Sequence, residues 1–541
     1  MQTWHYLDNS ATTPLCEEAK SAMLEAMEVF GNPSSLHGAG QEASRLLARA
    51  RACVANALGI SSPMPGELIF TSCGTEASNT ALLGTLLSGK HLAGRRVITT
   101  DCEHPSVENV MRRLEQEGFE VVRIGAPRGV LDTDAALAAL EIPTALVSLM
   151  MVNNETGARF DVEHVFRAAK QKNPATFTHC DAVQGFLKVP FTAASLGADL
   201  ITVSGHKIHA PKGVGALYIK PALVRSHAVS PYLIGGGQEA GLRSGTENMV
   251  GICGFGAAAA RGAAAFAADT AHMQALHDRL ESALTGTEVR VNRPAGAAAP
   301  HILNLTLPDI KSQTMLNYLS EQGICVSSGS ACSAHGGKTS PSLLSFGLSP
   351  HEADCSLRVS FSARNTAEDV DALVADVFGV LVPFLDEGGG NVGVLACGDF
   401  HAFGETCVAV MFDDHVGMGA VGCDDRQVER VEVLAGAMHF DEHRLVDLTV
   451  DGQYSSAFAG IPFDCGHAVV RLGDDACAGV PHRAFGIRDA FGKRRPVDHG
   501  NGDLRFIGWF EHIEELLDAL YRRVAPVLLF AVRLGERFDV E

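Results

Sequence analysis

Residues 198–218 read ADLITVSGHKIHAPKGVGALY, with Lys207 near the centre. Residues 199–203 are a short apolar, β-branched run of the kind that forms a buried strand, and a Pro/Gly-rich turn follows the lysine. The pattern predicts that Lys207 lies at the end of a strand. An apolar setting favours the neutral, nucleophilic amine of a lysine, which Schiff-base chemistry requires. A surface lysine beside a glycine turn is the alternative interpretation of this stretch alone.

The composition describes an ordinary globular chain, because 46% of its 541 residues are hydrophobic and 20% are charged. We find no apolar run as long as a membrane span and no signal-peptide pattern at the start, so we expect a cytoplasmic protein. The 14 cysteines contain no CxxC pair, which argues against a zinc ribbon and a compact disulfide framework. The net charge of −20 disfavours direct nucleic-acid binding.

Strands and helices alternate between residues 67 and 204. We expect strands at 68–71, 96–100, 120–124, 145–152, 176–180 and 199–203. This alternation predicts a largely parallel sheet covered by helices on both faces. Polar residues gather where these strands end, which is the edge where open α/β sheets bind ligands.

Two groups of strand-end residues could hold a phosphate. Residues 73–76, Cys-Gly-Thr-Glu, stand at a predicted helix start and offer backbone N–H groups and a hydroxyl. Ser204 and His206 flank the lysine and could donate to the same phosphate. A Gly-Thr turn is also a common way to begin a helix, so this group is not decisive by itself.

Three further residues could contact the ring of pyridoxal phosphate. Asp181 could keep a pyridinium nitrogen protonated, and Gln184 could reach a phenolic oxygen. His104 could stack on the ring face. Taken singly, Asp181 could be a helix N-cap and His104 an ordinary loop histidine.

The order of the motifs is more informative than any one of them. They are YLDNSATTP, GNPSSLHGAG, TSCGTEASN, EHPSV, MVNNETG, DAVQ, SGHKIHAPKG, GGGQEAGLRSGTEN, SSGSACS and SLRVSFSARNT. Together they closely resemble the NifS/IscS group of cysteine desulfurases, from residue 4 to about residue 385. These enzymes belong to the class V aminotransferase-like, fold-type I enzymes that use pyridoxal 5'-phosphate.

The resemblance implies a role for each matching residue. Lys207 would carry the cofactor, with Asp181 on the pyridine nitrogen and Cys332 as the nucleophile that receives sulfur. Gln184 and His104 would contact the ring of the cofactor. The phosphate would be bound by Gly74, Thr75, Ser204 and His206. His104 is also implied in catalysis.

The substrate and partners follow from the same resemblance. Asn154 and Arg358 would bind L-cysteine, with the arginine on its carboxylate. Thr246 would reach the phosphate of the partner subunit's cofactor, which implies a homodimer. The reaction would yield L-alanine and a persulfide on Cys332. The long loop around Cys332 fits delivery of sulfur to an acceptor protein, for iron-sulfur cluster assembly or for thiolation of tRNA or cofactors.

Three alternatives remain at this point. The first is a selenocysteine lyase or another class V aminotransferase-like enzyme, and the second is a non-catalytic scaffold that keeps the fold. The third concerns Cys332 alone, which could be a buried inert thiol. Cys73 and Cys180 depart from the family pattern and are interpreted as packing substitutions, and Cys325 is expected in the core.

The resemblance predicts a fold-type I α/β enzyme in four parts. Residues 1–20 would be an N-terminal arm contributing to the small domain, and 21–255 the large cofactor-binding domain. Residues 256–387 would be the small α+β domain with the Cys332 loop, and 388–541 an extension of unknown fold.

The extension resembles no family and shows no clear sheet pattern, although residues 510–530 could form an amphipathic helix. Its eight histidines and five cysteines are irregularly spaced, as at Cys397, Cys407 and Cys423, so we predict no metal site. It is either an accessory interaction domain or an unselected extension that would be poorly ordered.

Overall fold

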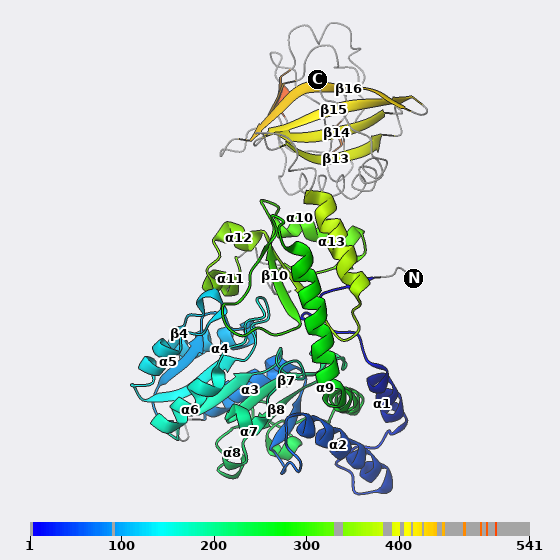
Figure 1. The fold of residues 1–541 in the computed structure, drawn as a ribbon. Helices are drawn as coiled ribbons and strands as arrows, with labels where there is room; N and C mark the ends of the chain where they lie inside the picture. Colours follow the sequence, from blue (N-terminus) through cyan, green and yellow to red (C-terminus); the bar gives the residue numbers. More distant parts are fainter. Residues whose placement is uncertain are drawn as a thin grey trace. The chain divides into compact units, whose positions relative to one another are not determined.

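The computed structural model describes residues 4–88, 92–328 and 339–381, and the backbone of strands between residues 392 and 505. The chain divides into two compact units, Met1–Asp376 and Val377–Glu541. Figure 1 shows the helices and strands of both units.

The first unit is built around a seven-stranded sheet in the order β2-β8-β7-β6-β5-β3-β4. Only β8 runs antiparallel to its neighbours in this sheet, so the sheet is largely parallel, as the alternating pattern predicts. Its strands are β2 (Leu68–Thr71), β3 (Arg96–Thr100), β4 (Glu120–Ile124), β5 (Thr144–Met150), β6 (Phe177–Asp181), β7 (Leu200–Ser204) and β8 (Gly215–Ile219).

Helices cover this sheet and connect its strands. The connecting helices are α3 (Gly74–Leu86), α4 (Pro105–Gln116), α5 (Thr133–Ala139), α6 (Val162–Lys172), α7 (Ala193–Leu196) and α8 (Pro221–Arg225). The amphipathic pattern of α4 buries Val107, Val110 and Leu114. The central strands β5, β6 and β7 are buried along their whole length, because helices cover both faces of the sheet.

Three long helices pack together beside the sheet: α1 (Glu17–Glu28), α2 (Gly38–Ala57) and α9 (Met249–Leu284). A Cβ atom at Gly256 of α9 would lie 2.7 Å from the Cα atom of Ala50, so α2 and α9 approach backbone to backbone. Phe255 of α9 is fully buried and meets Phe70 and Phe186 edge to face, with ring centroids 6.3 and 6.5 Å away.

Within the described ranges, α9 is long and apolar enough to cross a membrane by length and composition alone. Arg261 and Asp269 interrupt its apolar stretch, so the expectation that no uninterrupted apolar run has the length of a membrane span stands. The apolar character of α9 comes largely from alanines, and its first turns pack against α2 in the core. It therefore fits the role of a core helix.

A smaller α+β part follows α9. Its antiparallel sheet has the order β12-β10-β9, with β9 (Arg290–Val291), β10 (Ile302–Thr306) and β12 (Ser356–Ser360). Its helices are α10 (Ser312–Glu321), α11 (Pro341–Phe346), α12 (Pro350–Asp354) and α13 (Ala367–Leu381). The N-terminal strand β1 (His5–Tyr6) pairs in parallel with β11 (Ile324–Cys325), so the first residues of the chain lie against this part.

The second unit contains a seven-stranded sheet in the order β13-β14-β15-β16-β17-β18-β21. Its strands are β13 (Val392–Phe400), β14 (Glu405–Phe412), β15 (His415–Asp424), β16 (Gln427–Phe440), β17 (Val446–Thr449), β18 (Val469–Arg471) and β21 (Leu504–Arg505). A separate pair joins β19 (Ile487–Arg488) to β20 (Arg494–Arg495).

The interpretation that the extension has no clear sheet pattern is therefore wrong, because its strands form a sheet. Within β16, residues 430–433, RVEV, alternate polar residues with valine, which is the two-residue period of a strand. The many glycines of the neighbouring strands weaken that signal in the sequence. The helix predicted at residues 510–530 lies outside the described residues.

Candidate active site

Lys207 lies directly after β7, in a 3₁₀ turn formed by Gly205–Lys207, as the sequence pattern predicts. A Cβ atom at Gly205 would meet Val214 Cγ1 at 2.9 Å, so the turn needs a glycine there. The part-buried lysine nitrogen donates to the carbonyl oxygens of Ser10, at 2.5 Å, and Ala11, at 2.9 Å. The amine is thus turned inward by the N-terminal segment, and the alternative of a surface lysine is rejected.

Asp181 is the last residue of β6, on the strand next to β7. Its carboxylate is buried and accepts a hydrogen bond from the Val183 N–H at 3.0 Å. Burial raises the pKa of Asp181 to about 6, and the nearby Lys207 partly opposes this rise. A buried carboxyl group with such a pKa can share a proton with an aromatic ring nitrogen.

A narrow, polar cradle forms where α3 begins. Cys73 precedes this helix without a side-chain cap, so the first N–H groups of α3 are left for another acceptor. Ser204 Oγ is buried and has no hydrogen-bond partner among the described residues. A Cβ atom at Gly74 would lie 3.4 Å from Ser204 Cβ and 3.1 Å from Val183 Cγ2, and would fill this space. An orphaned hydroxyl beside a free helix N-terminus fits a phosphate group.

Two histidines lie close to Lys207. His104 caps α4, and its Nδ1 accepts from the Ser106 N–H at 3.1 Å. His206 Nδ1 lies 3.2 Å from Thr12 Oγ1. Burial, followed by the charge of Lys207, lowers the pKa of each histidine to about 4. Both rings are therefore neutral at pH 7, and a neutral ring is the form that stacks on another aromatic ring without bringing in a charge.

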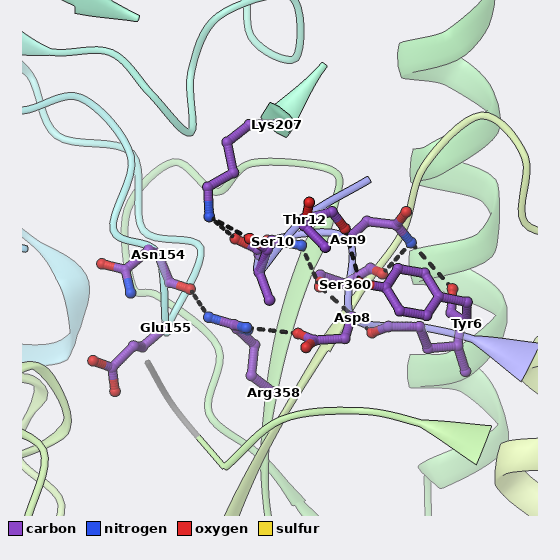
Figure 2. Close-up of polar contacts among 12 residues, drawn as sticks. Tyr6, Asp8, Asn9, Ser10, Thr12, Asn154, Glu155, Lys207, Arg358 and Ser360 are labelled. Carbon is purple, nitrogen blue, oxygen red and sulfur yellow. Dashed lines mark hydrogen bonds and ion pairs between the residues drawn. The ribbon is translucent and has the colours of Figure 1, made fainter. Parts of the chain in front are cut away.

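Arg358 of β12 is fully buried, and Figure 2 shows its guanidinium between Asn154 and Asp8. Nη1 donates to the backbone oxygen of Asn154 at 3.0 Å, and Nη2 lies 2.6 Å from Asp8 Oδ1. Its Nε has no partner among the described residues. A buried guanidinium with a free donor is suited to receive a carboxylate.

The N-terminal segment supplies site residues that the sequence reasoning missed. The carbonyl oxygen of Ser10 accepts from Lys207 and also from Gln184 Nε2, at 2.9 Å, and Asp8 holds Arg358. The motif YLDNSATTP marked this segment in the sequence. Every residue has a backbone carbonyl oxygen, so the sequence could not show that those of Ser10 and Ala11 accept hydrogen bonds from Lys207.

Glu103 was also missed. Its Oε1 accepts from the Met150 N–H at 2.8 Å and from Thr100 Oγ1 at 3.0 Å. Burial, followed by the charge of Asp181, raises the pKa of Glu103 to about 8. This carboxyl group is therefore largely neutral at pH 7, and its place next to His104 in EHPSV was the available signal.

Thr75 and Thr246 are exposed, and Cys332 lies outside the described residues. Thr246 belongs to the segment between the turn Glu239–Gly241 and α9. Arg243 of this segment pairs with Glu76 of α3 at 2.8 Å, and Glu239 of the preceding turn pairs with Arg51 of α2 at 2.6 Å. The structure thus leaves Thr246 on a fixed, outward-facing segment.

The remaining cysteines behave differently from one another. Cys180 is fully buried next to Asp181, and burial raises its pKa well above the usual value, so it is an inert packing residue. Cys73 is half-buried at the start of α3. The expectation that Cys325 lies in the core is wrong, because the two-residue strand β11 pairs with β1 and leaves its side chain half-buried. Among the described residues no cluster of metal-ligating side chains occurs.

Comparison with known proteins supports one family. Residues 5–373 match the model of the family described as aminotransferase class-V. The chain is 38% identical to a cysteine desulfurase of Trichormus azollae over 68% of this chain and 90% of that protein. It is 36% identical to the cysteine desulfurase NifS of Azotobacter vinelandii over 69% of this chain and 91% of that protein.

A solved structure of a NifS-like protein superposes with a TM-score of 0.65 and 35% identity, covering 70% of this chain and all of that chain. Residues 5–373, which match the family model, contain the cradle at α3, Lys207 and Arg358. The chain therefore belongs to the class-V aminotransferase family and, within it, to the NifS/IscS cysteine desulfurases.

Proposed function

We propose that this protein converts L-cysteine to L-alanine and transfers the sulfur to Cys332 as a persulfide, with pyridoxal 5'-phosphate as its cofactor. The observation that carries the proposal is the convergence of the Lys207 amine, the buried Asp181 carboxyl and the orphaned Ser204 hydroxyl at one edge of the sheet. Lys207 would supply the amine that holds the cofactor, Asp181 the partner of its ring nitrogen, and Ser204 a hydrogen-bond donor to its phosphate.

The bound cofactor would supply an electron sink that makes the bonds at Cα and Cβ of an amino acid easier to break. Ser204 and the first N–H groups of α3 would hold its phosphate, together with Gly74, Thr75 and His206. Asp181 would keep a proton on the ring nitrogen, and Gln184 and His104 would contact the ring. Lys207 would hold the cofactor and then act as the base at Cα, because its nitrogen is placed by two carbonyl oxygens.

Arg358 would bind the carboxylate of L-cysteine, with Asn154 beside it. The free Nε of this buried guanidinium supports that role, because an unpaired buried donor gains most from a new acceptor. Asp8 would keep the guanidinium oriented while the site waits for substrate.

Cys332 would receive the sulfur. Its thiolate would attack the substrate sulfur, so that an S–S bond forms as the Cβ–S bond breaks and the electron pair remains with the carbon product, which becomes alanine after protonation. The persulfide would then pass to an acceptor protein, either an iron-sulfur scaffold or an enzyme that thiolates tRNA.

The proposed assembly is a homodimer in the cytoplasm. Large apolar side chains are exposed in the loops between helices, with Phe30 at 90%, Leu36 at 91% and Ile234 at 87%, and exposed apolar side chains favour burial by a partner. Thr246 would reach the cofactor phosphate of the partner subunit from its outward-facing segment. The described cysteines are all free thiols, which fits a reducing compartment.

The proposed domain division remains 1–20 for the arm, 21–255 for the large domain, 256–387 for the small domain and 388–541 for the extension. The pairing of β1 with β11 supports assigning the arm to the small domain. The compact unit Met1–Asp376 supports a boundary in or shortly after α13.

The test is an ultraviolet-visible spectrum followed by alanine and sulfide assays with L-cysteine. Wild type and Cys332→Ala should both show the absorbance of lysine-bound cofactor, and Lys207→Ala should lose it. Cys332→Ala should also lose sulfide release, whereas Cys53→Ala, a half-buried thiol of α2, should not. Turnover that ignores Cys332 would contradict the proposal, and turnover confined to L-selenocysteine would identify a selenocysteine lyase.

A further inference from the structure

A buried lysine lies behind Gln184. Lys188 is 6% exposed and follows the end of β6 in a turn closed by its own N–H and the Gly185 oxygen, at 3.0 Å. Long apolar stems usually carry a lysine amine out to water, so a buried amine points to a specific use. Lys188 has no role in the reaction proposed above.

The amine of Lys188 meets the amide oxygen of Gln184. Nζ donates to Gln184 Oε1 at 3.5 Å, and His301 Nε2 lies 3.4 Å from the same oxygen. On its other side, the amide nitrogen of Gln184 donates to the Ser10 oxygen at 2.9 Å, and that oxygen also accepts from Lys207. The Gln184 amide is therefore flanked by donors at its oxygen and by an acceptor at its nitrogen.

The surroundings of Lys188 are basic. The charged and titratable groups that interact with it are Lys207, Arg358, His206, His209 and His301. Burial, followed by the charges of Lys207 and Arg358, lowers the pKa of Lys188 to about 7. A neutral amine still donates a hydrogen bond, so this environment preserves the contact with Gln184 while it reduces the cost of a buried charge.

We propose that Lys188 is a positioning residue: with His301 it occupies the amide oxygen of Gln184 and thereby directs the amide nitrogen toward Ser10 and toward the phenolic oxygen of bound pyridoxal phosphate. This inference rests on the role of Gln184 in the proposed function. The amide nitrogen has two hydrogens and Ser10 takes one, so the second is left for the cofactor.

If Lys188 positions Gln184, removing Lys188 should change how readily the lysine-bound cofactor loses its proton. A donor at the phenolic oxygen favours the anion there, and it makes the proton that this oxygen shares with the Lys207 nitrogen easier to lose. Without Lys188 the Gln184 amide is held less firmly, because its oxygen loses the contact with the lysine nitrogen. The weaker hydrogen bond from Gln184 to the phenolic oxygen raises the pH at which the absorbance of the lysine-bound cofactor changes.

The experiment is a spectrophotometric pH titration of the purified holoenzyme. Lys188→Met, which keeps the length of the side chain, should move the midpoint upward by about one pH unit, the size expected for one hydrogen bond. Gln184→Met should shift it at least as far. The double variant should match Gln184→Met, because Lys188 acts through Gln184, whereas additive shifts would overturn the proposal.

A matched control separates this effect from a general loss of stability. Lys170 of α6 is a partly buried lysine whose Nζ donates to the Thr176 oxygen at 2.6 Å and pairs with Asp199, at the end of β7 away from Lys207. Lys170→Met should lower the melting temperature and leave the titration midpoint in place. An equal shift in Lys170→Met and Lys188→Met would overturn the proposal.

The outcomes also distinguish this inference from the proposed function. A wild-type protein without cofactor absorbance would count against the proposed function, whereas a normal wild type with an unshifted Lys188→Met midpoint would reject this inference alone. If Lys188→Met does not fold, Lys188→Gln decides, since it removes the charge and keeps a donor. A midpoint near that of wild type supports positioning, and the full shift of Gln184→Met overturns it.

Discussion

At the scale of single residues, burial determines what the polar groups of the site can do. Arg358 is held on two sides, by the Asn154 oxygen and by Asp8, yet its Nε is free among the described residues. Asp181 and Glu103 are buried carboxyls with raised pKa values, and His104 and His206 are neutral rings. At pH 7 Glu103, His104 and His206 are thus largely neutral, whereas Asp181 is largely ionised.

Arg358→Lys should raise the KM for L-cysteine by about 10- to 100-fold, because a lysine offers no planar pair of donors and one charge-assisted hydrogen bond is lost. The cofactor spectrum should not change. Arg279→Lys, at an exposed pair with Asp371 at 2.7 Å, is the matched control and should behave as wild type. Steady-state kinetics would check this, and an unchanged KM would remove Arg358 from the substrate site.

His179→Gln should change how stability depends on pH. His179 is buried between Ser148 Oγ, at 2.8 Å, and Thr202 Oγ1, at 3.0 Å, and burial lowers its pKa from 6.5 to about 3. A lowered histidine pKa gives stability that is present above pH 6.5 and lost as the pH falls toward 3. Between pH 7 and pH 5 the native histidine should cost about 2 kcal/mol of unfolding free energy.

The measurement for His179 is denaturant unfolding of both proteins at pH 7 and pH 5. The comparison with His179→Gln is needed because Asp181 and Glu103, whose pKa values are raised, change stability in the opposite direction over part of this range. If wild type and variant lose the same free energy between the two pH values, His179 is not the group that takes up the proton.

At the scale of elements, the site depends on how closely α3, β7 and β8 approach one another. A Cβ atom at Gly215 of β8 would lie 2.6 Å from the carbonyl carbon of Cys73, so β8 passes directly beneath the start of α3. Gly74 then meets Ser204 of β7 with no side chain between them. Glycine is needed at both positions because backbone approaches backbone there.

Gly74→Ala should weaken binding of pyridoxal phosphate by about 10-fold, because the added methyl group fills the cradle against Ser204. Stability should change little, since alanine favours a helix. The matched control is Gly38→Ala at the first residue of α2, where a Cβ atom would meet nothing within 4 Å. Equilibrium titration of the apoenzymes would test this, and equal affinities for Gly74→Ala and wild type would place the phosphate elsewhere.

At the scale of the whole molecule, the described candidate residues all belong to the unit Met1–Asp376. The N-terminal segment joins β7, β6 and β12 through Ser10 and Asp8 within that unit. The extension contributes its own sheet, in strands that pair with one another. The described hydrogen bonds and ion pair of the candidate site therefore join residues of the first unit.

A chain that ends at Glu387 should retain desulfurase activity within about twofold of the full chain, because its core and site lie in the first unit. Alanine production at matched cofactor content would measure this. Limited proteolysis of the full chain bears on the extension itself. A stable fragment ending near Glu387 would favour an unselected extension, whereas a resistant second unit would favour an accessory domain.

Local patterns in the sequence determined the elements and the types of residue at the site. Strands β2, β3 and β4 have the predicted bounds, and Lys207 follows β7, because short apolar runs and glycine turns act over a few residues. Helix α3 begins at Gly74, within residues 73–76, the segment predicted to stand at a helix start. The order of the motifs identified the family.

The contacts that complete the site were decided only by the tertiary structure. Asp8 meets Arg358 across 350 residues of sequence, and the Ser10 oxygen meets Lys207 across 197. The burial of Lys188 and the orphaned Ser204 hydroxyl likewise depend on what packs around them. A local pattern reports which groups a segment carries, but hydrogen bonds and pKa values depend on neighbours that only folding brings together.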